Sequence, residues 1–332
     1  MQTTVNYQGD VELVTELQKS VKEIKHEVAK IIIGQEETID NLLTSLFARG
    51  HCMLVGVPGL AKTLIIKTLS EVLDLQFSRI QFTPDLMPSD ITGTEILEED
   101  LSTKKREFRF IKGPIFANIV LADEINRTPP KTQAALLEAM QEHNVTAAGT
   151  KYLLPEPFFV LATQNPIEQE GTYPLPEAQL DRFMFNLWLD YPSFEEEVDI
   201  ISSTTGSQSS KLQKTINSEK IQSFQELVRR VPVAENVIKH AVTIVKRTRP
   251  DNELINESIR NLISWGAGPR ASQYLILAAK TYAIMDGRYS PEIADVDRAL
   301  IPVLRHRIIP SFNAEAEGIT SVDIINKLNL NQ

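Results

Sequence analysis

Residues 54–63, Leu-Val-Gly-Val-Pro-Gly-Leu-Ala-Lys-Thr, constrain the possible folds of this chain more than any other segment. The apolar run that ends at Val55 predicts a buried strand, and the apolar periodicity after Thr63 predicts a helix. Small residues between them let backbone N–H groups approach phosphate oxygens. Lys62 supplies a cation for the β and γ phosphates, Thr63 supplies a hydroxyl for Mg²⁺, and the helix turns its positive end toward the anion. The segment therefore predicts a phosphate-binding loop for a magnesium-bound nucleoside triphosphate.

One position departs from the usual loop pattern, because Ala61 stands where a glycine normally precedes the lysine. Alanine is the better helix former, and its single methyl group leaves room for the phosphates. Taken alone, the segment is also compatible with an ordinary glycine- and proline-rich turn between a strand and a helix.

Composition limits the class of protein. The 332 residues predict two domains, or one large domain with a helical attachment. The single cysteine, Cys52, excludes an internal disulfide and a multi-cysteine metal site. No apolar run approaches the roughly 20 residues that span a bilayer, and the N-terminus lacks a signal layout, so we expect a soluble cytoplasmic protein without a membrane segment. The net charge of −10 argues against a dedicated nucleic-acid binder, and the basic run 104–109 is interpreted as a solvated loop.

Short apolar runs alternate with helical patterns between residue 50 and residue 191. The predicted strands are 52–55, 77–82, 119–122, 158–163 and 185–189, and the predicted helices are 62–74 and 131–142. This alternation is typical of a parallel sheet with helices on both faces, which binds ligands at the carboxyl ends of its strands. The fold class is therefore α/β.

Helical patterns flank this core. Residues 11–33 carry one apolar stripe at three- and four-residue spacing. The polar stretch 202–215 predicts a flexible connection. Beyond it the predicted helices are 219–231, 234–248, 256–265, 270–286, 291–308 and 321–329. We therefore expect an N-terminal helix plus nucleotide-binding core in 1–201, a linker in 202–217 and an all-helical domain in 218–332.

Two more strands end in polar residues. The strand at 119–122 runs directly into Asp123 and Glu124, and adjacent buried carboxylates are costly unless cations hold them. We assign Asp123 to the metal, directly or through water, and Glu124 to polarising the attacking water. The next strand ends near Asn165, whose amide is suited to the γ phosphate or the water, although Asn165-Pro166 is equally suited to a simple turn.

These motifs together resemble those of the AAA+ ATPases, and the residues within each motif resemble those of the MoxR branch. The segments that carry the resemblance are 56–63 (Gly-Val-Pro-Gly-Leu-Ala-Lys-Thr), 122–127 (Ala-Asp-Glu-Ile-Asn-Arg), 162–166 (Ala-Thr-Gln-Asn-Pro), 175–183 (Leu-Pro-Glu-Ala-Gln-Leu-Asp-Arg-Phe) and 268–271 (Gly-Pro-Arg-Ala). Loops of that branch contain alanine where Ala61 stands. The resemblance implies an AAA+ P-loop parallel sheet sandwiched by helices, followed by an all-helical lid domain.

The resemblance also implies roles for further residues. Arg182 matches the arginine finger that reaches a neighbouring subunit's nucleotide; a structural pair with Asp181 is the alternative. Arg270 matches the second sensor arginine, and it follows Pro269 near the positive end of a helix, where an anion is needed. The insertions at 91–110 and 144–154 match loops that line a pore or touch substrate, and surface hairpins are the alternative. The implied nucleotide-binding residues are Ile33, Gly34, Gly56, Val57, Pro58, Gly59, Leu60, Ala61, Lys62, Thr63, Leu64, Asp123 and Arg270; Thr63 and Asp123 bind the metal, and Lys62, Glu124, Asn165 and Arg182 are catalytic.

The predicted activity is the hydrolysis of ATP bound together with Mg²⁺. The resemblance implies that the chain forms a homo-oligomeric, hexameric ring. The resemblance adds chaperone-like remodelling, maturation or metal-cofactor insertion of a client protein, with a von Willebrand A-type domain as partner. The alternative is a nucleic-acid motor or branch-migration subunit. Its DNA contact would lie past residue 218, which carries the basic segments 229–230, 246–247 and 305–307 but no helix-turn-helix or winged pattern. A nucleotide-dependent switch without turnover is disfavoured by Glu124, Arg182 and Asn165 together.

Overall fold

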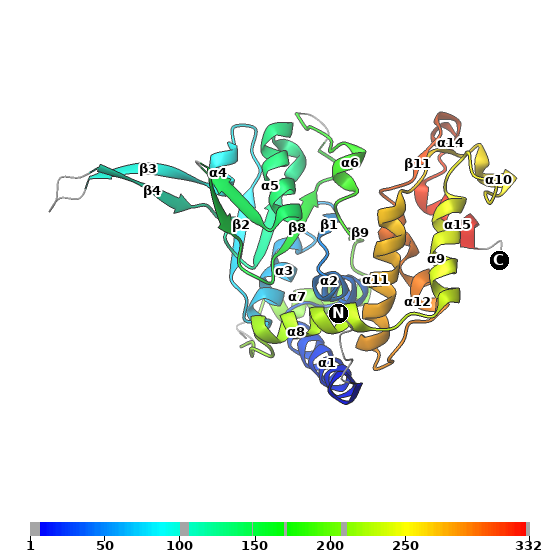
Figure 1. The fold of residues 1–332 in the computed structure, drawn as a ribbon, viewed down its shortest axis with the longest axis horizontal. Coiled ribbons are helices and arrows are strands. Elements are labelled where there is room, and N and C mark those ends of the chain that lie inside the picture. Colours follow the sequence, from blue (N-terminus) through cyan, green and yellow to red (C-terminus); the bar gives the residue numbers. More distant parts are fainter. Residues whose placement is uncertain (1–6, 100–105, 148, 169–170, 207–210, 330–332) are drawn as a thin grey trace.

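A five-stranded parallel sheet forms the centre of the molecule (Figure 1). The computed structural model describes residues 7–99, 106–147, 149–168, 171–206 and 211–329. The strands run in the order β2-β5-β8-β1-β9 and every neighbouring pair is parallel. Their bounds are β1 Cys52–Val55, β2 Phe77–Gln81, β5 Ile119–Asp123, β8 Phe159–Gln164 and β9 Phe185–Trp188. The predicted α/β parallel sheet is confirmed.

Helices cover both faces of this sheet. Alternate residues of one strand face opposite sides, so Leu54 of β1 packs into one apolar core and Met53 into the other. The first core contains residues of α1 Tyr7–Val28, α2 Glu36–Phe47 and α3 Lys62–Val72, and it continues into the C-terminal helices. The second contains residues of α4 Pro88–Thr92 and α5 Pro130–Glu142.

Two antiparallel hairpins occupy the predicted insertions. Strands β3 Gly93–Glu99 and β4 Arg106–Lys112 stand well away from the body, at the left of Figure 1. Strands β6 Asn144–Ala147 and β7 Thr150–Leu153 form the second hairpin. The ring of Phe110 stacks on that of Tyr152 with centroids 4.2 Å apart, so the two hairpins support each other at their bases.

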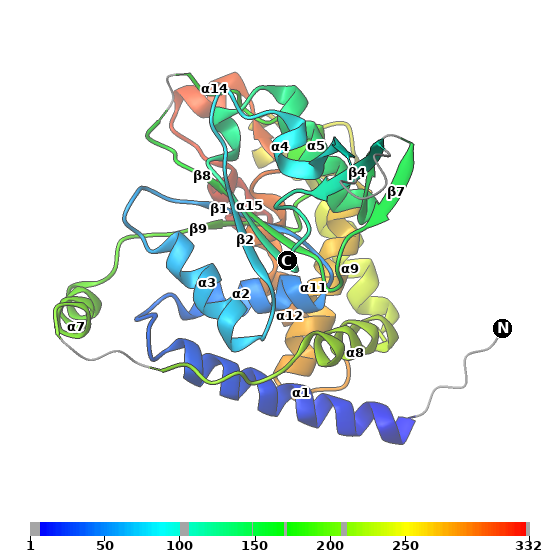
Figure 2. The same cartoon turned by 90° about the vertical axis from the view of Figure 1, so that its left-hand side faces the viewer.

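The remaining elements are mainly helical. They are η1 Ile125–Arg127, α6 Glu177–Leu180, α7 Phe194–Thr204, α8 Ser218–Arg230, α9 Glu235–Arg247, α10 Glu257–Arg260, β10 Ile263–Trp265, α11 Pro269–Met285, α12 Ile293–Arg298, α13 Leu300–Leu304, β11 Ile309–Pro310, α14 Phe312–Ala316 and α15 Ser321–Asn329. Figure 2 shows α7 projecting from the body on the side of α3, and α8 lying close to α1. No helix of the described ranges is both long and apolar enough to cross a bilayer.

Several predicted boundaries are wrong. The helix predicted for 11–33 ends at Val28, after which the chain turns and Ile32 enters the core. The helix predicted for 256–265 ends at Arg260, because residues 263–265 pair antiparallel with β11 and tertiary pairing overrides local helix propensity. The helix predicted for 291–308 is divided into α12 and α13.

The connection between the sheet and the later helices also differs from its prediction. It begins after Thr204 instead of at residue 202, because α7 continues to that residue. The N–H of Thr215 donates to the Val72 carbonyl oxygen at 2.8 Å, so the end of the connection follows α3. Residues 207–210 of the connection, residues 104–105 of the basic run and Ala148 of the second insertion lie outside the described residues.

Candidate active site

The glycine loop connects β1 to α3 at the carboxyl edge of the sheet. The N–H of Gly56 donates to the Gln164 carbonyl oxygen at 3.2 Å, which places the start of the loop beside the end of β8. Gly59 has φ 91°, a conformation that favours glycine. Ala61 precedes α3 with φ 54°, in the left-handed region. A non-glycine residue there costs on the order of 1 kcal/mol, which explains why a glycine is usual at this position.

Lys62 points back toward the loop and the acids. Its ammonium donates to the Gly56 carbonyl oxygen, so the loop closes on itself. Partial burial lowers the pKa of Lys62, and the carboxylates of Asp123, Glu124 and Glu168 oppose this shift. The lysine therefore lies within the electrostatic reach of the two acids that the sequence assigned to the metal and the water.

Asp123 is the last residue of β5, and both of its carboxylate oxygens have partners. Oδ1 accepts from Thr163 Oγ1 at 2.6 Å, and Oδ2 accepts from Arg79 Nη2 at 2.6 Å. The side chain is nearly buried, with 7% of the residue exposed. An uncompensated carboxylate in such surroundings would be costly, so the hydrogen bonds from Arg79 and Thr163 stabilise its charge.

Glu124 follows with φ 56°, a second left-handed residue at the site. Its N–H donates to Thr163 Oγ1 at 2.9 Å. Its Oε2 accepts from Gln81 Nε2 and from Arg127 Nη1, both at 2.9 Å. The left-handed turn separates the two carboxylates, and Thr163 contacts both residues.

Asn165 completes the group at the end of β8. It is 5% exposed, and its Oδ1 accepts from the Ile167 N–H at 3.2 Å. Its amide nitrogen Nδ2 is buried and finds no acceptor among the described residues. A buried donor without a partner costs about 1–3 kcal/mol, and an anion on the loop would remove that cost.

Arg182 and Arg270 lie apart from this group. Arg182 Nη1 donates to the Leu137 carbonyl oxygen at 2.7 Å. Arg270 Nη1 donates to Asp181 Oδ2 at 2.9 Å, and Arg307 Nε donates to Asp181 Oδ1 at 2.7 Å. The alternative of a pair between Arg182 and Asp181 is therefore wrong. Within the described residues, neither Arg182 nor Arg270 donates a hydrogen bond to the glycine loop or to the two acids.

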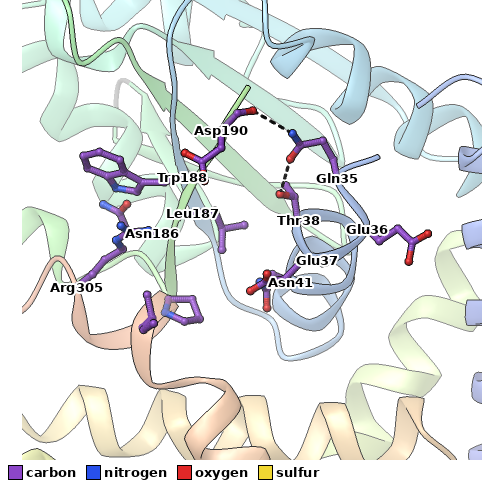
Figure 3. A pocket seen from close by; sticks show the side chains of 12 residues that line it. Gln35, Glu36, Glu37, Thr38, Asn41, Asn186, Leu187, Trp188, Asp190 and Arg305 are labelled. Atoms are coloured by element: carbon purple, nitrogen blue, oxygen red, sulfur yellow. Dashed lines mark hydrogen bonds between the residues drawn. The ribbon is translucent and has the colours of Figure 1, made fainter. Parts of the chain in front are cut away.

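Ile33 and Gly34, which the family resemblance implies to bind the nucleotide, precede α2. Gly34 has φ 70° and Gln35 has φ 60°, and the pair turns the chain from α1 into α2. Gln35 borders a hollow of about 410 Å³ between α2, β9 and α13 (Figure 3). Its Nε2 donates to the Asp190 carbonyl oxygen at 3.3 Å and its Oε1 accepts from Thr38 Oγ1 at 3.0 Å.

The wall of this hollow contains an aromatic ring and a buried amide. The guanidinium of Arg305 lies 4.7 Å from the centroid of the Trp188 ring. Asn186 is 7% exposed, and its Oδ1 has no hydrogen-bond partner in the described part of the chain. Because β9 pairs with β1, the hollow lies one strand away from the start of the glycine loop.

Arg79, Gln81, Thr163 and Arg127 contact the two acids and were not predicted. The order of the strands explains the first two, because β2 is the neighbour of β5 and pairs Gln81 with Asp123. In the sequence, these two contacts are indicated only by the segment Arg79-Ile80-Gln81, in which polar residues take alternate positions of a predicted strand and so share one side of it.

The residues present fit a magnesium nucleotide. Lys62 and the unpartnered amide of Asn165 are donors for phosphate oxygens. Gly59 leaves open space where a side chain would stand. Thr63 in the first turn of α3 and Asp123 supply oxygen atoms of the kind that Mg²⁺ prefers. The nucleotide would lie at the positive end of α3.

Comparison with known proteins gives consistent results. Residues 51–185 match the ATPase family associated with various cellular activities (AAA), and residues 256–328 match the AAA lid domain. Chaperone MoxR1 of Mycobacterium tuberculosis is 42% identical over 302 residues, which cover 91% of this chain and 79% of that protein. YeaC of Bacillus subtilis is 42% identical over 309 residues, 92% of either chain. A crystal structure from Cytophaga hutchinsonii superimposes with a TM-score of 0.90 at 40% identity and covers 98% of both chains.

Proposed function

Because the chain belongs to the MoxR-type AAA+ ATPases, we propose that it hydrolyses ATP between two copies of itself and thereby remodels a partner protein. The observation that carries the proposal is the convergence of Lys62, Asp123, Glu124 and Asn165 at one edge of the sheet, where the amide nitrogen of Asn165 has no acceptor among the described residues. The bound Mg²⁺ would screen phosphate charge during transfer to water.

Different residues of the chain bind the phosphates, the metal, the attacking water and the base in this proposal. Lys62 and the loop N–H groups bind the phosphates, and Thr63 and Asp123 hold the metal. Glu124 orients the attacking water, and Asn165 donates its free amide hydrogens to the γ phosphate or to that water. Ile33 and Gly34 receive the base, for which the adjoining hollow offers about 410 Å³ and the free acceptor of Asn186.

The remaining arginines support a shared site. Arg182 donates to the Leu137 carbonyl oxygen and Arg270 to the Asp181 carboxylate, and within the described residues neither donates to the loop of its own chain. We propose that Arg182 serves the nucleotide of the next subunit in a homo-oligomeric, hexameric ring, and that Arg270 binds a γ phosphate. We also propose a nucleotide-binding core, a connection after Thr204 and a helical lid that begins at Ser218. The two family matches, at 51–185 and 256–328, lie on either side of this connection and support the proposal.

The client is a protein in this proposal. The β3–β4 hairpin presents Leu97 and Phe108 as a cross-strand pair, 53% and 74% exposed, and Leu153 of the other hairpin is 73% exposed. Exposed apolar side chains of this size are suited to contact an unfolded or remodelled chain. The relative from Mycobacterium tuberculosis carries the name chaperone. By analogy with the family, we extend this proposal in three ways. The chain acts in maturation or metal insertion of its client, it has a partner with a von Willebrand A-type domain, and it is located in the cytoplasm.

The test uses Lys62→Ala with Lys67→Ala as its control. Lys67 lies on the exposed side of the same helix, so the control removes an equal charge without touching the loop. Lys62→Ala should weaken ATP binding and abolish phosphate release, and Lys67→Ala should leave both unchanged. Phosphate release by Lys62→Ala at the parental rate would refute the assignment of the loop.

A further inference from the structure

The metal-binding carboxylate is already held by a cation of the chain itself. Arg79 Nη2 and Nε lie 2.6 and 3.1 Å from Asp123 Oδ2. Since Thr163 donates to Oδ1, both carboxylate oxygens of Asp123 accept hydrogen bonds from the chain itself. The side chain of Arg79 is 48% exposed and that of Asp123 is 11% exposed, so the arginine is the partner with freedom to move.

The guanidinium of Arg79 is also linked to Glu124 through the side chain of Gln81. Arg79 Nη2 also donates to Gln81 Oε1 at 2.7 Å, and Gln81 Nε2 donates to Glu124 Oε2 at 2.9 Å. Arg79 and Gln81 are two residues apart on β2, so their side chains stand on one side of the strand. The contacts form a continuous chain from Asp123 through Arg79 and Gln81 to Glu124.

We infer that Arg79 is a positioning residue that occupies the magnesium-binding carboxylate in the ligand-free chain and ties it, through Gln81, to the water-orienting glutamate. This rests on the proposed function of the site. A guanidinium and a divalent cation cannot both lie against Asp123 Oδ2 without strong repulsion. Arg79 therefore leaves Asp123 when the metal site fills, and the hydrogen bond that fixes Gln81 against Glu124 is lost with it.

A purely structural role makes a different prediction. If Arg79 only neutralises Asp123 to stabilise the fold, its removal lowers stability and leaves the need for metal unchanged. If Arg79 competes with the metal, its removal also makes the site easier to fill. The magnesium requirement for nucleotide binding separates the two roles without any measurement of turnover.

The experiment titrates Mg²⁺ into the full chain with a fluorescent ADP analogue and follows binding. For Arg79→Ala we expect half-maximal binding at about tenfold less Mg²⁺ than for the parent, since the charge-assisted hydrogen bonds from Arg79 to Asp123 no longer compete with the metal. Arg79→Gln keeps most of the side-chain volume and should shift the requirement in the same direction. Arg230→Ala removes the arginine of a remote pair with Asp10, at 2.8 Å, and should shift nothing.

An unchanged or higher magnesium requirement in the folded Arg79 variants would overturn the inference while leaving the proposed function intact. If the parent binds no nucleotide at any Mg²⁺ concentration, both are wrong.

The link to Glu124 is tested by a double-mutant cycle. Gln81→Leu should lower the magnesium requirement by a smaller factor than Arg79→Ala, because Arg79 then loses one of its two anchors. In the Arg79→Ala background, Gln81→Leu should have no further effect. Independent, multiplying effects of the two substitutions would show that the connection between the acids does not exist.

Discussion

At the scale of single residues, His51 shows how completely one side chain is enclosed by the sheet and α5. Its Nε2 lies 3.1 Å from the Met140 carbonyl oxygen, and the Val160 N–H donates to Nδ1 at 3.1 Å. The ring is therefore neutral, with the proton on Nε2. Burial lowers the pKa of His51 to about 4, and the Met140 carbonyl oxygen partly opposes the shift.

This histidine predicts acid sensitivity of the fold. Because the pKa of His51 is lower in the folded state than in the unfolded state, its contribution is fully present above pH 6.5 and is lost as the pH falls toward 4. The free energy of unfolding should decrease by about 3 kcal/mol over this window through His51. Urea unfolding at pH 7 and pH 4.5 measures the decrease, and His51→Gln should show a smaller one. Equal decreases in the parent and the variant would contradict the prediction.

Residues of the site could be predicted from the sequence where they belong to one continuous motif. Lys62 follows its loop, and Asp123 and Glu124 end an apolar strand, so chemistry and position could be inferred together. Arg79 and Thr163 could not be inferred, because their contact with Asp123 depends on which strands are neighbours. The pairing of Arg270 with Asp181 likewise joins residues far apart in the chain.

At the scale of elements, α1 is held by one stripe of buried residues. Val14, Leu17, Val21, Ile24 and Val28 are each at most 5% exposed. These residues recur every three or four positions, which places them on one face of the helix. The stripe was predicted from the sequence, and the end of the helix was not, because Ile31 and Ile32 continue the periodicity beyond the last helical residue.

The stripe predicts a contrast between two substitutions in α1. Leu17→Ala empties a fully buried position and should lower the free energy of unfolding by about 2–5 kcal/mol. Val11→Ala changes a position that is 44% exposed and should remain within about 0.5 kcal/mol of the parent. Chemical denaturation of both variants measures the difference, and equal losses would show that α1 does not dock as described.

Two further elements show the limits of local patterns. The helix α2 was not predicted, although Ile39, Leu42, Leu43 and Leu46 have helical spacing. The strand β10 was predicted as helix, since only its distant partner β11 makes it a strand. The first miss was avoidable from sequence, and the second required knowledge of the tertiary fold.

At the scale of the whole molecule, Arg307 ties the end of the sheet region to the C-terminal helices. It is 6% exposed and donates to Asp181 Oδ1 and to the carbonyl oxygens of Asp181 and Phe183. Burial lowers the pKa of Arg307, and the Asp181 carboxylate opposes that shift. These contacts join a loop after α6 to the segment after α13.

Arg307 and Arg270 both donate to the Asp181 carboxylate, and we expect their removal to lower the free energy of unfolding by different amounts. Arg307→Ala leaves buried acceptors without donors and should cost about 3 kcal/mol or more of unfolding free energy. Arg270→Ala removes a side chain that is 40% exposed, and should cost at most about 1 kcal/mol in the ligand-free chain. Thermal or urea unfolding distinguishes them, and an equal cost would mean that Arg307 is not a buried tie.

A shared site predicts rescue between inactive chains. Arg182→Ala should lower turnover by about 10³–10⁵ while nucleotide affinity stays near the parental value. Glu124→Gln should also be inactive, and a mixture of the two should regain part of the activity, since some interfaces then combine an intact Arg182 with an intact Glu124. Phosphate release is measured over a range of mixing ratios. No recovery at any ratio would count against a site between subunits.

Ala61, left-handed between loop and helix, has one more consequence. Its methyl group restricts the backbone torsions that a glycine would sample freely, so the loop has less conformational entropy to lose when it closes on an anion. The unfavourable torsion is adopted when the chain folds, so binding of an anion requires little further ordering of the loop.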